Sequence, residues 1–184
     1  MTDRDSPAEI LGEGRFLRLL SKNGWEWVER TQCSGVVVIL ALTAENKVLL
    51  VEQYRAPMDS NVIEFPAGLA GDLPEYKNEA LEDAATRELL EETGYRAGEM
   101  HYQLAGPVSA GMSSEQIHFL EARNLEKVAP GGGDETESIT VHEILLEEAD
   151  DWLRRRINEG TPVDPKVFAG LYFLHGNAAL TASS

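Results

Sequence analysis

The chain has 184 residues, of which 42% are hydrophobic and 26% are charged. These values are ordinary for a globular protein, and the length suits one domain with a sizeable core. The formal net charge is −16, and so acidic a surface repels a phosphate backbone. We therefore expect no nucleic-acid partner, and the excess acids serve either solubility or cation binding.

A single cysteine, Cys33, excludes a disulfide within the chain and a metal cluster built on cysteines. The first residues, "MTDRDSPAEI", lack the apolar run of a signal peptide, and "GVVVILAL" is too short to span a bilayer. The sequence thus predicts no membrane partner and a cytoplasmic location.

The N-terminal segment, residues 1–34, predicts an antiparallel hairpin. "RFLRLLSK" and "WEWVERTQC" alternate as strands do, and Asn23-Gly24 between them is a strong turn signal. We expect this hairpin to be distinct from a main domain at residues 35–184.

The main domain begins with "GVVVILAL", a β-branched run typical of a strand buried on both faces. A short link, "TAEN", joins it to "KVLLVEQY", which predicts a second hairpin. "NVIEF" is a short strand, and Pro66-Ala67-Gly68 after it predicts a turn.

Helical periodicity replaces alternation from about Asn78 to Glu92, and Gly94 is well placed to end that helix. Strands are predicted at "HYQLAG", "QIHFLEAR" and "SITVHEILL", and two more helices at "EEADDWLRRRINEG" and "DPKVFAGLYFLHGN". The pattern favours an α/β (α+β) sandwich with a mixed sheet over a repeating βαβ fold.

One stripe of the central helix changes from apolar to acidic along its length. At helical spacing it contains Leu81, Ala84, Ala85, Glu88, Glu91 and Glu92. Three neighbouring carboxylates repel one another, and acids near a helix C-terminus oppose the helix dipole. Either this end is solvated, or it binds a divalent ion, for which oxygen-only ligands indicate Mg²⁺ or Mn²⁺.

The segment "RELLEETGY" resembles the Nudix signature R-E-U-x-E-E-x-G-U at every fixed position, where U is apolar. Glu79 supplies the upstream glutamate, and seven residues separate it from Arg87. Nudix hydrolases cleave a nucleoside diphosphate linked to another moiety, so the resemblance implies this activity and an αβα sandwich. One departure is the loop after Gly68, where ten residues precede Glu79 instead of five.

The resemblance also implies roles within the signature. Glu88 and Glu92 become the main metal ligands, with a further carboxylate from Glu91 and the backbone carbonyl of Ala67. Four residues, Gly68, Glu79, Arg87 and Gly94, become structural. The implied ion is Mg²⁺, with Mn²⁺ as a substitute, and it would activate both the phosphate and a water.

The segment "VEQYRAPMDSNVIEFPAGLAG" resembles the ADP-ribose pyrophosphatase branch of the family. This implies that Arg55 contacts a phosphate, because its guanidinium matches that anion. Glu64 then orients Arg55 or assists the metal site. The alternatives are a surface arginine at a strand end and a glutamate facing water.

Trp25 and Trp27 fall on the same face of one strand because Glu26 separates them. In this branch, aromatic residues of the N-terminal region stack on the adenine, commonly across a homodimer interface. That role is implied for Trp27 first and for Trp25 second. The alternative is packing in a core or a subunit interface.

Two loops carry the remaining candidates. The glycine-rich "GGGDETESITV" resembles a loop that brings a glutamate to the attacking water, which implies Glu137 as general base and Glu135 as its substitute. "PVSAGMSSEQ" resembles a loop on the substrate side, which implies that Glu115 contacts the terminal ribose or the metal.

The implied reaction is hydrolysis of ADP-ribose to AMP and ribose 5-phosphate. GDP-mannose or another nucleoside diphosphate sugar is the alternative substrate. A binding module without activity is the third possibility, although such modules are expected to lose signature carboxylates, and this chain keeps them all.

Overall fold

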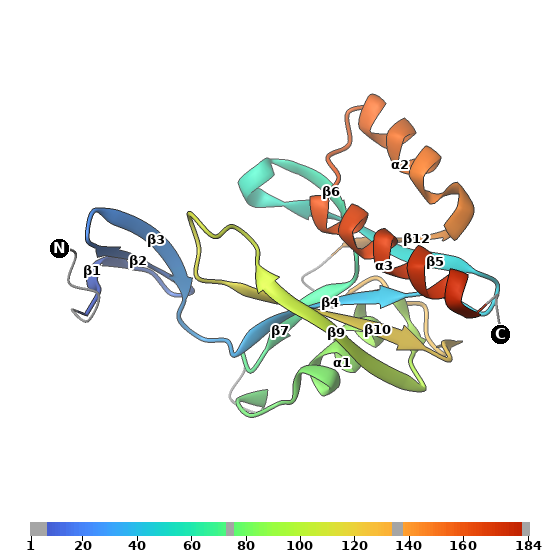
Figure 1. Cartoon of the computed structure of the whole chain (residues 1–184), viewed down its shortest axis with the longest axis horizontal. Coiled ribbons are helices and arrows are strands. Elements are labelled where there is room, and N and C mark those ends of the chain that lie inside the picture. Colours follow the sequence, from blue (N-terminus) through green and yellow to red (C-terminus); the bar gives the residue numbers. More distant parts are fainter. Residues whose placement is uncertain (1–6, 73–75, 134–137, 182–184) are drawn as a thin grey trace.

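The computed structural model describes residues 7–72, 76–133 and 138–181 (Figure 1). Its strands are β1 (Glu9–Glu13), β2 (Leu17–Lys22), β3 (Trp25–Arg30), β4 (Gly35–Ala41), β5 (Lys47–Arg55), β6 (Ser60–Glu64), β7 (Ala67–Ala70), β8 (Tyr95–Arg96), β9 (Glu99–Pro107), β10 (Gln116–Arg123), β11 (Glu126–Lys127) and β12 (Ile139–Leu145). Its α-helices are α1 (Leu81–Thr93), α2 (Ala149–Asn158) and α3 (Pro165–Thr181).

Two central sheets separate α1 from α2 and α3. One sheet has the order β7-β4-β10-β9 and is mixed, because β10 runs parallel to β4 and antiparallel to β9. The other has the order β12-β5-β6 and is antiparallel. In Figure 1, α1 lies on one side of these strands and α2 and α3 lie on the other. The predicted αβα sandwich with a mixed sheet is confirmed.

Strand β4 shows why its sequence is apolar without interruption. Val37 and Ile39 pack with the buried face of α1, whereas Val38 and Leu40 pack in the second core with α2 and α3. Since both faces are covered, every position of the strand except the partly buried Val36 is buried, and alternation disappears.

The N-terminal hairpin is present and gains a third strand. Asn23 and Gly24 have φ angles of 52° and 81°, as a tight hairpin turn between β2 and β3 requires. Strand β1 pairs with β2 and was missed because its exposed residues carry no apolar alternation. The three strands form a sheet that projects from the body of the molecule in Figure 1. The division at residue 34 stays a prediction.

Two local predictions were wrong. β4 and β5 belong to different sheets, and only Leu42 and Val48 bridge them near the connecting turn. The segment after Pro66 is not simply a turn, because Ala67 begins β7, which pairs with β4. The sheet that a strand joins depends on partner strands distant in the sequence, and local sequence patterns do not predict them.

Within the described segments, no helix combines the length and the apolarity needed to cross a membrane. A cytoplasmic location stays a prediction.

Candidate active site

The acidic end of α1 follows the apolar end inward, as the stripe predicts. Ala84, Ala85 and Leu89 are fully buried against the sheets, and Glu92 is 3% exposed. Glu88 is also largely covered, with 17% of its side chain exposed, whereas Glu91 is half exposed. Of the three carboxylates, Glu92 is therefore the most buried, Glu88 is largely buried, and Glu91 lies at the exposed edge of the helix.

The Glu92 carboxylate is held from two strands. The backbone N–H of Ala67, at the start of β7, donates to Oε2 at 3.1 Å. The side-chain amide of Gln53, near the end of β5, donates to Oε1 over 3.5 Å. Gln53 was not among the predicted site residues, since a single amide in a strand carries no sequence signal for such a contact.

Glu88 occupies space that a side chain at residue 68 would fill. A Cβ added to Gly68 would lie 1.9 Å from the Glu88 carboxyl carbon, so only glycine permits this approach. Burial raises the pKa of Glu88 to about 7, although the adjacent Arg87 acts in the opposite direction. An uncompensated negative charge is therefore costly at this position.

Arg87 joins the parts of the signature. Its Nε and Nη2 donate to the two oxygens of Glu79 at 3.2 and 3.1 Å, and Nη2 also donates to the Leu69 carbonyl at 3.2 Å. Its Nη1 donates to Glu88 at 2.9 Å and to Glu91 at 3.3 Å. Burial alone would lower the pKa of Arg87, but its hydrogen bonds to Glu79 and the charge of Glu88 raise it above its ordinary value.

The inserted loop contributes a contact that the sequence did not predict. The Arg87 guanidinium carbon lies 4.7 Å from the centre of the Tyr76 ring, a cation–π distance. Tyr76 stands in the stretch between Gly68 and Glu79 that departs from the family pattern. The longer loop thus reaches the arginine that organises the signature.

The C-terminus of α1 is capped from the segment after β11. Gly94 ends the helix with a φ of 72°, in agreement with the sequence prediction. The N–H groups of Gly132 and Gly133 donate to the carbonyls of Glu92 and Glu91 at 2.8 and 3.2 Å. Lys127 Nζ donates to the Thr93 carbonyl at 2.8 Å, which places a positive charge at the negative end of the helix dipole.

The general-base candidates, Glu137 and Glu135, lie outside the described residues. Among the described ranges, no three His, Cys, Asp or Glu side chains are gathered as a ligand shell, and Arg87 instead binds both Glu88 and Glu91. The donor set nevertheless fits a hard divalent cation, because it is made of oxygens and includes the buried Glu88 beside Gly68.

Arg55 and Glu64 meet across the paired strands β5 and β6. Arg55 Nε donates to Glu64 Oε2 at 3.0 Å, and Nη2 contacts the same oxygen. The contact holds the guanidinium beside Glu64, and the role of either residue toward a substrate stays a prediction.

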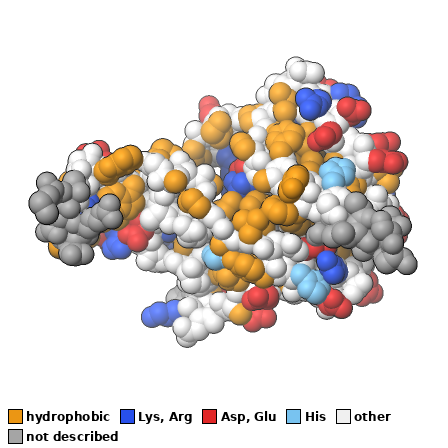
Figure 2. Space-filling model, in the orientation of Figure 1, with side chains coloured by type: hydrophobic (Ala, Val, Ile, Leu, Met, Phe, Trp, Pro, Cys, Tyr) orange, Lys and Arg blue, Asp and Glu red, His pale blue; other side chains and the backbone are white. Residues whose placement is uncertain are grey.

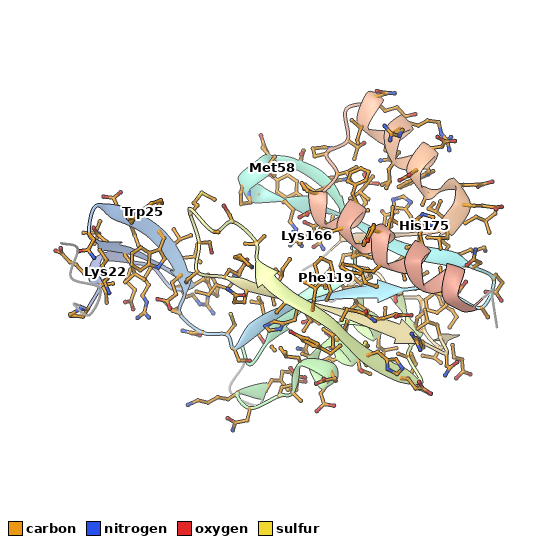
Figure 3. The ribbon with its side chains drawn as sticks, viewed as in Figure 1. Lys22, Trp25, Met58, Phe119, Lys166 and His175 are labelled. Atoms are coloured by element: carbon orange, nitrogen blue, oxygen red, sulfur yellow. The ribbon has the colours of Figure 1, made fainter. Side chains whose placement is uncertain are left out.

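A cavity of about 280 Å³ lies between the N-terminal sheet and the loop after β9. Its walls include Trp25 and Trp27 on one side and Gly111 and Ser113 on the other. Trp25 is 66% exposed and projects from the N-terminal sheet in Figure 3, whereas Trp27 is partly buried. The exposed ring therefore belongs to Trp25, the second of the two candidates.

Glu115 forms an ion pair with Arg30 of β3. Its carboxylate is engaged between the loop after β9 and the N-terminal sheet, and Arg30 was not among the predicted site residues. Val28 N–H donates to the Met112 carbonyl at 2.9 Å in the same region. These contacts attach the N-terminal sheet to the substrate-side loop.

Comparison with known proteins agrees with this geometry. The family model described as the NUDIX domain matches residues 32–160, and the chain therefore belongs to the Nudix family. A solved structure described as an ADP compounds hydrolase has the same fold, with a TM-score of 0.69, 20% identity, and coverage of 92% of this chain and 90% of its own.

Three relatives have names that describe their activity. An ADP-ribose pyrophosphatase of Bacillus subtilis (strain 168) is 37% identical over 80% of this chain and 76% of its own length. An ADP-sugar pyrophosphatase of Mus musculus is 32% identical over 92% of this chain and 87% of its own. A methanol dehydrogenase activator of Bacillus methanolicus is 37% identical over 66% of this chain and 64% of its own, so the match spans just under two thirds of that protein.

Proposed function

We propose that the protein hydrolyses the pyrophosphate of ADP-ribose to AMP and ribose 5-phosphate with Mg²⁺, for which Mn²⁺ can substitute. The observation that carries this proposal is that Glu92 and Glu88 lie on the inner face of α1 beside Ala67 and Gly68, with Glu91 next to them at the edge of the helix. The ADP-ribose pyrophosphatase of Bacillus subtilis among the relatives supports the choice of substrate.

In this proposal Glu88, Glu91, Glu92 and the Ala67 carbonyl hold the ion. Once bound, a divalent ion neutralises charge on the pyrophosphate and lowers the pKa of a water. Arg87 keeps Glu88 and Glu91 close together before the ion binds. Its hydrogen bonds to Glu79 hold the guanidinium next to both carboxylates. A bound cation would favour the charged form of Glu88, whose pKa is raised by burial.

Arg55 contacts a phosphate, with its guanidinium held by Glu64. Trp25 stacks on the adenine in the cavity of the N-terminal sheet, which is supported by its exposure, and Trp27 forms the wall beside it. Base stacking of this kind contributes about 1–3 kcal/mol. Glu115 stays a candidate for the terminal ribose, and binding there would compete with its ion pair to Arg30.

An assay for phosphate released by a coupled phosphatase tests the reaction. ADP-ribose carries no phosphate monoester, whereas both products do, so phosphate appears only after cleavage. We expect release with Mg²⁺ and none with a chelator. Glu92→Gln should abolish turnover without unfolding the chain, and Glu82→Gln, an exposed change on the same helix, should not. Full turnover by Glu92→Gln, or by wild type in chelator, would refute the metal assignment.

The substrate alternatives separate in the same assay. A panel containing ADP-ribose, GDP-mannose and other nucleoside diphosphate sugars should favour ADP-ribose in kcat/KM. A preference for GDP-mannose would establish the second candidate. Binding of ADP-ribose without release of phosphate would establish a sensing module.

The general base is proposed to be Glu137. Glu137→Gln should lower kcat with little change in KM, because the lost group accepts a proton and does not bind the substrate. The same loss in Glu135→Gln alone would transfer the role to Glu135.

A homodimer is proposed from the N-terminal sheet. The sheet and its connections expose apolar side chains, including Ile10 at 51%, Phe16 at 59% and Trp25 at 66%. Figure 2 shows hydrophobic side chains on the projecting part of the molecule. Three short strands with so little burial gain little stability by themselves. A second copy covering this sheet would bury these side chains and bring Trp25 to a composite site.

A further inference from the structure

Gln53 is a buried amide beside the acidic face of α1, and it has no role in the reaction proposed above. It is 6% exposed and lies on β5, which pairs on both sides, with Val62 opposite on β6 and Ile139 opposite on β12. Its backbone is therefore fixed by two neighbouring strands. By alternation its side chain shares the face of Leu49, which packs with α1.

The amide group of Gln53 meets the most buried carboxylate of the signature. Its Nε2 lies 3.5 Å from Glu92 Oε1, and the Ala67 N–H lies 3.1 Å from Oε2. The two oxygens are thus approached from two different strands, which fixes the plane of the carboxylate. Hydrogen-bond partners of this kind hold a metal ligand in the orientation that the ion needs.

We propose that Gln53 is a positioning residue for the metal site, which sets the orientation of the Glu92 carboxylate for a divalent ion. This inference rests on the proposed function, because it takes Glu92 as a ligand. A glutamine suits the position better than other polar residues. A lysine would offset the charge that attracts the ion, and a carboxylate would repel Glu92, whereas an amide donates a hydrogen bond and carries no charge.

The chain provides a matched control in Gln103. Its Nε2 donates at 2.8 Å to Glu121, a carboxylate that is 7% exposed and lies outside the signature. Gln53→Met and Gln103→Met each replace a glutamine that serves a buried glutamate with an apolar side chain of similar length. Of the two glutamine–glutamate pairs, only Gln53 and Glu92 include a proposed metal ligand.

The experiment measures Mn²⁺ affinity by calorimetry on the full chain after chelator treatment. Wild type, Gln53→Met, Gln103→Met and Glu92→Gln are compared, and near-ultraviolet circular dichroism checks the fold. We expect Gln53→Met to weaken Mn²⁺ binding by about 10–100-fold and Gln103→Met by less than about twofold. The kcat of Gln53→Met should recover as Mn²⁺ is raised. If Gln53→Met does not fold, Gln53→Asn replaces it, since its shorter amide also fails to reach Glu92.

Three outcomes overturn the inference. An affinity of the Gln53 variant within about twofold of wild type removes the positioning role. An equal loss in Gln103→Met shows a general effect of removing a buried amide. Wild type that takes up no Mn²⁺, or Glu92→Gln that binds it as wild type does, overturns the proposed metal site itself, and this failure is distinct from the other two.

Discussion

At the scale of single residues, charge and space within a few ångströms of α1 decide what the site can bind. Glu88 is buried beside Gly68, and its nearest cation, Arg87, is shared with Glu79 and Glu91. One guanidinium faces three carboxylates, so negative charge is left over. Attraction for a divalent cation follows from this excess.

The pH dependence of stability should report the titration of Glu88. Its folded-state pKa of about 7 is raised, so the folded chain binds a proton that the unfolded chain releases near pH 4.5. The stability from this group is complete below pH 4.5 and is lost as the pH rises through about 7. In chelator, melting curves of wild type should therefore fall relative to those of Glu88→Gln over this interval. Parallel curves would contradict the burial of the charge.

Gly68→Ala should weaken metal binding, because its Cβ would lie 1.9 Å from the Glu88 carboxyl carbon. Displacing that group costs about 1–3 kcal/mol of folding stability, as overpacking does. Gly106→Ala is the control, since no atom lies within 4 Å of its added Cβ. Mn²⁺ calorimetry and thermal melts of both variants make the comparison, and equal behaviour would count against the close approach of Glu88.

At the scale of elements, the C-terminal end of α1 shows how the helix is stabilised by other parts of the chain. The helix has acids in its last turn and no basic residue there, and the opposing charge comes from Lys127 on β11. Backbone N–H groups of Gly132 and Gly133 donate to the carbonyls of the two glutamates. The cap thus joins α1 to the chain that leads toward the candidate base.

Gly94→Ala should destabilise the fold more than Gly160→Ala. Both glycines follow a helix with positive φ, 72° and 94°, so the strain of a left-handed alanine, about 1–2 kcal/mol, is common to both. Only at Gly94 does the added Cβ also meet a neighbour, the Ala129 carbonyl oxygen at 2.0 Å. Denaturant unfolding of the two variants measures the cost of that clash. Equal losses of folding free energy would show that the loop after β11 moves away from the added Cβ at no cost.

At the scale of the whole molecule, the residues of the proposed site are divided between two parts. The carboxylates lie on α1 in the sandwich, whereas Trp25 lies on the N-terminal sheet, which projects from the body (Figure 1). Val28 and Met112 connect that sheet to the loop after β9. A second copy is the simplest way to cover the apolar side chains that the sheet exposes.

Light scattering after gel filtration should give the mass of a dimer. Replacing Phe16, which is 59% exposed, by Glu should shift the protein toward monomer, because a buried charge opposes association. Tyr172→Glu, on the exposed face of α3, is the matched control. A wild-type monomer would remove the composite site and with it the stacking of Trp25 across an interface.

The site was predictable where one element carries the whole signal. The stripe from Ala84 to Glu92 lies on one helix, so its spacing in sequence is also its spacing in space. Gln53, Tyr76 and Lys127 were not predictable, because each acts on α1 from a different part of the chain. Glu115 was predicted for the substrate, and the structure pairs it with Arg30, which is distant in sequence.

The sequence by itself determined the family, the helix with its acidic face, and most of the strands, because these depend on local periodicity and fixed motif spacing. Only the tertiary structure decided which strands pair. Strand β4 pairs with β7 and β10, and not with β5, which follows it in the sequence. The tertiary structure also decided how each carboxylate is held, as the two oxygens of Glu92 receive donors from β5 and β7. Contacts of this kind depend on the packing of the whole chain, and local periodicity carries no information about them.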